Sequence, residues 1–270
     1  MQHSYKRYIA CLVLLLCSPH IRAQTITLSA MHFPPHVVDS TIIPQLVSFD
    51  EKNTVYGLDV DLIRAAYASQ EVSIKIEIMS WKRIMRNMKA GLTLGAVTCR
   101  QVSPRSAFSF FSENISSSVV ALVTGKHLLD NKEITLEGLK SYKNVAVESW
   151  SQTNMLDDAN VAYKSVSSVQ QGLNLILRRG QEVLVVERDN ADYIAKKLGI
   201  EKKLSFYDLP SIESHYYSVC FSKKYPDARK WRDLLNKGLE TIKLNGVQER
   251  IFQRYGVSYD SINQSQAAKE

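Results

Sequence analysis

Three ionisable side chains stand directly after two apolar runs that read as strands. Arg100 and Arg105 follow a strand expected at 92–98, and Glu187 follows one expected at 183–186. A guanidinium holds a carboxylate through paired hydrogen bonds, and a carboxylate holds an ammonium group. This combination would suit a zwitterion such as an amino acid.

Uncharged polar and aromatic residues extend this set. Hydroxyl and amide groups at the start of a helix bind anions, and such a start follows the strand expected at 144–147. An aromatic side chain before two prolines could cover the apolar body of a ligand. The additional candidates from these positions are Ser151, Gln152, Thr153 and Phe33.

The elements that must position these residues alternate between strands and helices. Ile74, Ile76 and Ile78 show the period of two of a strand, whereas the segment 81–90 repeats its apolar residues at helical spacing and stops at Gly91. Expected strands are 26–30, 74–78, 92–98, 119–123, 144–147, 183–186 and 216–222, and expected helices are 60–68, 81–90, 168–179, 191–198, 226–244 and 247–255.

This order predicts an α/β protein with two β-α-β units, each building a mainly parallel sheet flanked by helices. Ligands of such open sheets bind at the carboxyl ends of the strands, near the point where the strand order switches. The candidate residues all follow strands, so we expect them to meet there.

Composition excludes several other classes. The chain has 270 residues, 45% of them apolar and 23% charged, which is typical of a folded protein with a substantial core. The net charge is +7, but residues 1–23 hold three bases and no acid, and the remainder carries only +4. No concentrated basic stripe is present, so we expect no nucleic-acid partner.

The N-terminus has the pattern of a secretory signal peptide. Lys6 and Arg7 precede a nine-residue apolar run, and a small residue, Ala23, ends the segment. The run is too short to span a bilayer. We expect cleavage after residue 23 and a soluble periplasmic protein, with a polar tail from about residue 258.

Export leaves Cys99 and Cys220 in a compartment where disulfides persist. Two buried free thiols and one bridge are both open at this stage. His32 and His36 flank two prolines and lack helical metal-ligand spacing, so we expect solvated loop histidines, no metal and no cofactor.

Several motifs, in order along the chain, resemble the bacterial extracellular solute-binding proteins of family 3, which serve amino-acid ABC transporters. They are Gly57-Leu58-Asp59-Val60-Asp61-Leu62, Arg105 with Ser112 seven residues later, Leu136–Lys140, Gly180–Glu187, Tyr217–Lys223 and Asn245–Tyr255.

The resemblance implies two lobes joined by two crossing strands that close on a ligand like a hinge. Lobe 1 would comprise 24–118 and 217–270, and lobe 2 would comprise 119–216. Arg105 would grip the ligand's α-carboxylate and Glu187 its ammonium group. Ser151, Gln152 and Thr153 would add carboxylate contacts, and Phe33 and Trp81 would form aromatic walls.

Two departures from the family pattern affect the ligand. Arg100 replaces a small hydroxyl residue, and Trp150 replaces a glycine beside the second-lobe anion site. Arg100 could select an acidic or dicarboxylate ligand, form an ion pair with Glu187, or face solvent. Glu187 could also pair with Arg188, Arg105 could bond a loop carbonyl, and Trp81 could be a core residue.

These observations favour a monomeric, non-enzymatic receptor that delivers a small carboxylate to a membrane permease. One alternative is a dehydratase-like enzyme on the same scaffold, with Glu187 as a general acid. Another is a sensing module that reports to a membrane receptor. The sequence contains none of the common hydrolase, metalloprotease or nucleotide-binding motifs.

Overall fold

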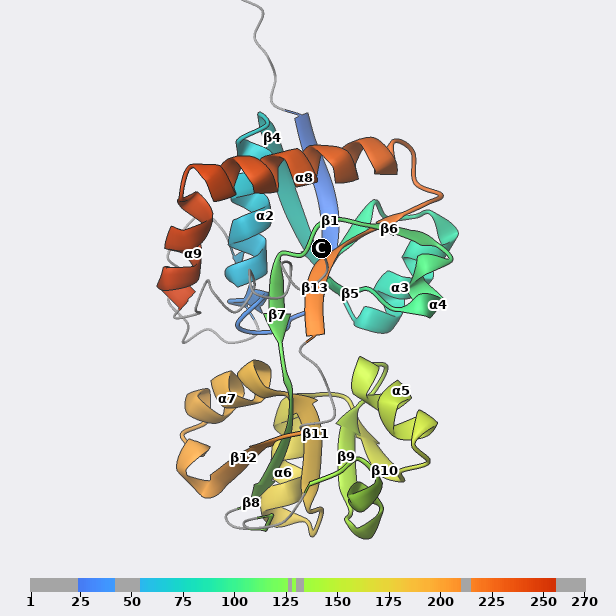
Figure 1. The fold of residues 1–270 in the computed structure, drawn as a ribbon, viewed down its shortest axis with the longest axis vertical. Helices are drawn as coiled ribbons and strands as arrows, with labels where there is room; N and C mark the ends of the chain where they lie inside the picture. Colours follow the sequence, from blue (N-terminus) through green and yellow to red (C-terminus); the bar gives the residue numbers. More distant parts are fainter. Residues whose placement is uncertain (1–23, 42–53, 126–127, 130–133, 210–214, 256–270) are drawn as a thin grey trace, which may run out of the picture.

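The computed structural model describes residues 24–41, 54–125, 128–129, 134–209 and 215–255. The expected signal peptide and polar tail lie outside these residues. The described chain forms two lobes, each built around one sheet (Figure 1). No helix among the described residues is long and apolar enough to cross a membrane.

The sheet of the first lobe has the strand order β4-β1-β5-β13-β6, and β7 also pairs with β13. Strands β1, β4 and β5 are parallel, as the β-α-β pattern predicts, whereas β13 runs antiparallel to β5. The bounds are β1 Gln24–Ala30, β4 Val72–Ile78, β5 Gly95–Arg100, β6 Ser109–Phe111, β7 Ser116–Ser118 and β13 His215–Ser222; a separate pair is β2 Val38–Asp39 with β3 Val55–Tyr56.

Helices cover both faces of this sheet (Figure 1). On one face, apolar side chains of α2, α8 and α9 form the main core with those of β1. On the other face, Trp81, Ile84 and Met88 of α3 pack against Cys99 and Cys220. The bounds are α2 Leu58–Ala68, α3 Trp81–Ala90, α4 Ser103–Ser106, α8 Ala228–Leu244 and α9 Val247–Tyr255.

The sheet of the second lobe has the order β10-β9-β11-β8-β12. Strands β9, β10 and β11 are parallel, and β8 and β12 are antiparallel to their neighbours. The bounds are β8 Val120–Gly125, β9 Asn144–Val147, α5 Ser151–Asp158, β10 Tyr163–Val166, α6 Val169–Arg178, β11 Val183–Glu187, α7 Arg188–Lys197 and β12 Leu204–Asp208, with short 3-10 turns at Glu137–Ser141 and Glu201–Lys203.

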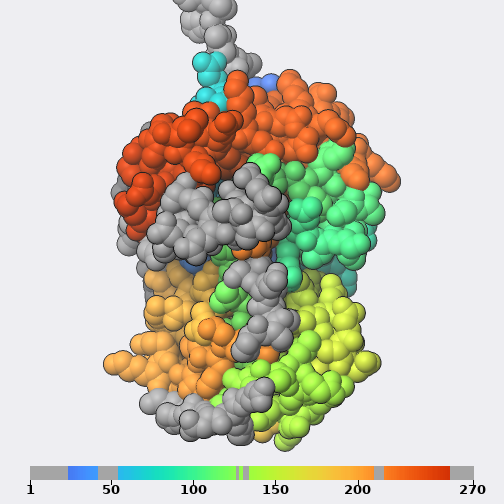
Figure 2. Space-filling model, in the orientation of Figure 1, coloured from blue at the N-terminus to red at the C-terminus, as the bar shows by residue number. Residues whose placement is uncertain are grey.

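The chain passes between the sheets twice, once from β7 to β8 and once from β12 to β13. Figure 2 shows the two lobes closely apposed, and hydrogen bonds join them. One bond runs from the Asn190 amide of α7 to the Pro34 carbonyl at 2.6 Å. The lobes are therefore closed against each other.

Local sequence signals explain several element ends. Gly91 ends α3 with a left-handed backbone (φ 75°), and the Ser168 hydroxyl caps α6 by accepting from the Gln171 amide. Ser80 holds the N-cap position of α3 but makes no side-chain cap bond. The strand expected at 92–98 instead begins at Gly95 and runs through Arg100, so Arg100 belongs to the strand itself.

Candidate ligand-binding site

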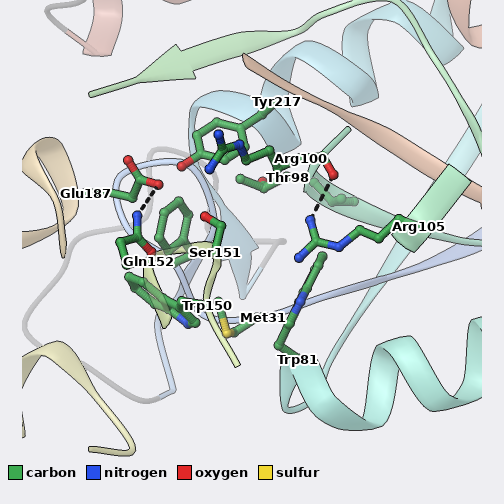
Figure 3. A pocket seen from close by; sticks show the side chains of 12 residues that line it. Met31, Trp81, Thr98, Arg100, Arg105, Trp150, Ser151, Gln152, Glu187 and Tyr217 are labelled. Atoms are coloured by element: carbon green, nitrogen blue, oxygen red, sulfur yellow. Dashed lines mark hydrogen bonds between the residues drawn. The ribbon is translucent and has the colours of Figure 1, made fainter. Parts of the chain in front are cut away.

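A cavity lies between the two lobes at the carboxyl ends of their strands (Figure 3). It contains about 450 Å³ of space not filled by atoms, part of it open to solvent. Eight of the nine expected ligand-binding residues line it, since Thr153 is absent from its wall. The lining residues are Met31, Phe33, Trp81, Val97, Thr98, Arg100, Arg105, Trp150, Ser151, Gln152, Glu187 and Tyr217.

Arg105 combines two of the roles considered from the sequence. Its guanidinium lies over the Trp81 ring, 5.0 Å from the centroid, and donates to the backbone oxygen of Arg100 at 2.8 Å. Burial and then the neighbouring Arg100 lower the pKa of Arg105 to about 10. The group remains charged at neutral pH, and its stacking on Trp81 leaves further N–H donors for a carboxylate.

Arg100 enters the cavity from the end of β5. Two residues before it, Thr98 has a left-handed backbone (φ 53°), and the pairing of β5 with β13 shifts register nearby. The Thr98 hydroxyl donates to Asp59 at 2.7 Å. Such a backbone conformation is uncommon outside glycine and concentrates at functional sites.

The ion pairs considered for Arg100 and Glu187 are absent. No carboxylate of the described residues lies within 4.0 Å of the Arg100 guanidinium, although Glu187 is close enough to offset part of the lowering of the Arg100 pKa by burial. Arg188 pairs with Asp208 instead of Glu187. The Glu187 carboxylate, buried to 2% exposure, accepts from the Gln152 amide at 2.7 Å.

The start of α5 supplies the wall from the second lobe. Trp150 is the N-cap residue, and no acid stands in the first turn to neutralise the helix dipole. Ser151 and Gln152 face the cavity (Figure 3). Thr153, expected as a ligand contact, lies outside the lining because its hydroxyl turns back to the Trp150 carbonyl at 2.7 Å.

Aromatic rings from both lobes bound the cavity. Trp150 packs edge-on against Phe33, with ring centroids 5.0 Å apart, and so joins lobe 2 to lobe 1. Trp81 is both a core residue and a cavity wall, since it packs in the cluster around α3 and also carries Arg105. Each of the three rings therefore has a structural contact besides its exposure to the cavity.

Four lining residues were not predicted from the sequence. Met31 lies directly after β1, and Tyr217 lies on β13, more than 100 residues from the arginines. Val97 and Thr98 lie within β5 and line the cavity where the backbone of Thr98 is left-handed. The rule that ligand residues follow strands could have found Met31, but the others depend on tertiary structure.

The expectation that His36 is a solvated loop histidine is wrong. His36 is 1% exposed and bridges the two lobes. Its Nδ1 lies 3.0 Å from the Asp59 carboxylate of α2, and its Nε2 lies 2.6 Å from the Asp189 carboxylate of α7. His32 is half-buried and accepts a hydrogen bond from the Asp39 amide. We call His36, Asp59 and Asp189 the interlobe triad.

The two cysteines lie on the neighbouring strands β5 and β13, with Cα atoms 5.7 Å apart. The structure joins them in a disulfide that links residues 121 positions apart. This bridge holds together the two strands that carry Arg100 and Tyr217.

Two sheets joined by two crossings, with a charged cavity between them, define the class of two-lobed periplasmic binding proteins. The sequence pattern of the bacterial extracellular solute-binding proteins, family 3, matches residues 37–258. The chain belongs to this family, as its motifs predict.

Solved structures support the same fold. An ancestral arginine-binding protein bound to glutamine is 18% identical, with a TM-score of 0.70 over 87% of this chain and 98% of that one. A Streptococcus pneumoniae substrate-binding protein with bound histidine is 15% identical (TM-score 0.71, 85% and 91%). A histidine kinase sensor domain is 17% identical (TM-score 0.73, 86% and 96%). A search of curated sequences finds no significant match.

Proposed function

We propose that this protein is a periplasmic receptor that captures an amino acid or related small carboxylate and delivers it to an ABC permease. The observation that carries the proposal is that Arg105 and Glu187 line the same interlobe cavity. Arg105 would bind the α-carboxylate and Glu187 the ammonium group. Closure of the lobes would bury the ligand and create a surface that the permease recognises.

The geometry supports each of these roles. Arg105 is held by the Trp81 ring and by the Arg100 carbonyl, so little conformational entropy remains to be lost when its guanidinium binds a carboxylate. The first residues of α5 line the same space from the other lobe, where the positive end of the helix dipole favours an anion. Phe33 and Trp150 would enclose the apolar part of a small ligand.

A thermal-shift screen tests the proposal. The mature protein would first be unfolded and refolded to remove any bound ligand, and then screened against amino acids, small dicarboxylates and cyclic carboxylic acids. A ligand at 100 times its Kd should stabilise the protein by about 2.7 kcal/mol and raise Tm by several degrees. A protein that responds to no member of this panel would contradict the proposed function.

The same capture could serve a sensing partner, because a histidine kinase sensor domain shares the fold. The partner would be identified by co-purification of the closed, ligand-bound protein with membrane permease or receptor proteins. Enzymatic turnover is not part of the proposal. An NMR spectrum of the bound acid should stay unchanged after long incubation, and appearance of a dehydrated product would favour the dehydratase alternative.

A further inference from the structure

We propose that the cavity selects an amino acid with a second carboxylate in its side chain, and that Arg100 determines this selectivity. The inference rests on the proposed function and names its substrate class. It goes beyond the roles proposed for Arg105 and Glu187, because every amino acid carries the α-carboxylate and the ammonium group that they would bind.

The charges of the cavity support an anionic ligand. The described lining contains two arginines, Arg100 and Arg105, and one carboxylate, Glu187, so its formal net charge is +1. The start of α5 adds a partial positive charge. A neutral zwitterion would leave this excess without a counter-charge inside the cavity, whereas an acidic amino acid carries −1 and neutralises it there.

The surroundings of Arg100 point to the same ligand. Its guanidinium is partly buried without an ion pair among the described residues, and burial lowers its pKa. Removing a guanidinium from water is costly unless a carboxylate compensates. Arg105 would hold the α-carboxylate, so Arg100 is the second cation, available for a side-chain carboxylate.

The surroundings of Gln152 indicate that the ligand also carries an ammonium group. Its amide nitrogen donates to Glu187, while its buried Oε1 has no hydrogen-bond partner in the described structure. In the view of Figure 3, Gln152 and Glu187 lie on one side, Arg105 on the other, and Arg100 between them. An ammonium group would satisfy the Gln152 oxygen and contact Glu187, so an acidic amino acid fits better than a simple dicarboxylate.

Titration calorimetry with near-isosteric pairs tests this selectivity. The refolded protein would be titrated with L-glutamate and L-glutamine, then with L-aspartate and L-asparagine. We expect at least one acidic member to bind tenfold or more tightly than its amide. Arg100→Gln should reduce that ratio to within about twofold, while Arg83→Gln, an exposed change of the same charge, should preserve it.

The outcomes separate the inference from the proposed function. Preference for an amide, or an unchanged ratio in Arg100→Gln, overturns the selectivity but leaves a receptor for neutral ligands. Binding of other carboxylates without either acidic amino acid also overturns it. If no amino acid or carboxylate binds, the proposed function fails as well.

The interlobe triad carries a second, independent inference. We infer that His36 is a proton-operated latch, which favours the closed lobes when it is protonated and releases them when it is neutral. None of its three residues is among the residues that line the cavity, so the latch is distinct from the residues proposed to hold the ligand.

The geometry favours a proton on each ring nitrogen. Asp59 and Asp189 each present an acceptor oxygen to a different nitrogen of His36, and a neutral imidazole can donate from only one. The other polar groups facing the ring are Ser116, whose hydroxyl lies 3.3 Å from Nδ1, and Tyr217, whose ring packs edge-on. No other cation among the described residues pairs with both carboxylates, so neutral His36 leaves them poorly compensated.

The backbone around Gly57 fixes one half of the latch in lobe 1. The Pro35 and His36 carbonyls accept from the first amides of α2, at Leu58 and Asp59. A Cβ at Gly57 would clash with the backbone oxygen of His36. His36 therefore stays beside Asp59, and lobe opening would remove only Asp189.

The direction of the pH effect follows from these contacts. Burial alone would lower the pKa of His36, but the nearby Asp59 and Asp189 carboxylates raise it well above 6.5 in the closed state. Opening removes Asp189 and so lowers this pKa. Closure therefore takes up protons between the two values, and rising pH favours the open lobes.

An interlobe distance measurement tests the latch in ligand-free protein. Spin labels would be attached through Lys75→Cys in lobe 1 and Lys164→Cys in lobe 2, both exposed. We expect the closed fraction at pH 6 to exceed that at pH 9 by threefold or more. Asp189→Asn should remove this difference, whereas Asp192→Asn, an equal charge change on the same helix, should retain it.

Each alternative result contradicts the latch. A closed fraction that is independent of pH, or absent at both values, overturns it. So does an Asp189→Asn variant that responds to pH like the parent. An NMR titration of the His36 ring in both variants adds a structural readout, since the His36 pKa should fall in Asp189→Asn but not in Asp192→Asn.

Discussion

The ligand cavity and the interlobe triad both join the lobes, but their charges are opposite. The cavity places two arginines against one glutamate, whereas the triad places two aspartates around one histidine. The cavity has an excess of positive charge, which a ligand carboxylate would neutralise. The triad has an excess of negative charge, which protonation of His36 reduces. Closure would therefore respond to two different signals, one chemical and one set by pH.

The largest effect is expected from removal of the disulfide, which supports the strands of the cavity, while the triad stays unchanged. Replacing Cys99 and Cys220 by serine should lower the free energy of unfolding by about 4 kcal/mol, because the bridge closes a long loop of the unfolded chain. Urea unfolding of the two forms measures this change. A free-thiol count of two in the unfolded, unreduced parent would show that the bridge is absent.

Arg105→Ala should next abolish most of the ligand affinity. Loss of the paired hydrogen bonds to a buried carboxylate should cost about 3 kcal/mol, or roughly a hundredfold in Kd. The pH dependence of closure should persist, because the triad is untouched. Calorimetric titration with the ligand that gives the largest thermal shift measures the loss, and equal Kd values for variant and parent would remove Arg105 from the site.

His36→Gln should have the opposite effect to Arg105→Ala: it should remove the pH dependence of closure and leave the ligand-binding arginine in place. It removes the charged partner of the buried Asp59 and should lower stability at pH 6 by about 2 kcal/mol. The stabilisation by a raised histidine pKa is complete below the unfolded-state value of about 6.5 and is lost as pH rises through the folded-state value. The stability difference between parent and variant should thus shrink towards pH 9. A difference that stays constant over this range would refute the protonated state.

The smallest effect concerns an exposed ion pair across the cleft. Lys82 of lobe 1 lies 3.7 Å from Glu148 of lobe 2, and both side chains are mostly exposed. Glu148→Gln should change stability or ligand affinity by at most about 0.5 kcal/mol, since solvent and salt screen such pairs. A larger effect at 0.15 M salt would mean that closure depends on surface charge more than on the two buried clusters.

The sequence predicted the elements with strong local signals. Helix α9 begins and ends as predicted, and Gly91 ends α3 with the expected left-handed backbone. Arg105 and Glu187 reach one cavity because residues after parallel strands meet at one sheet edge.

What the sequence could not show depends on contacts between distant segments. Asp189 meets His36 across 153 positions, so nothing near His36 marked it as buried. Thr98 lines the cavity at a point where its backbone is left-handed, and a threonine in a strand does not predict that conformation. Thr153 was assigned to the ligand from its place at a helix start, but its hydroxyl bonds the Trp150 carbonyl.

The interlobe distance, measured at pH 6 and pH 9 with and without whichever of L-glutamate and L-aspartate binds more tightly, tests the two-signal account most directly. We expect this acidic amino acid to close the lobes at both pH values, and protonation alone to raise the closed fraction at pH 6. Lobes that respond to neither acidic amino acid nor to pH would contradict the account.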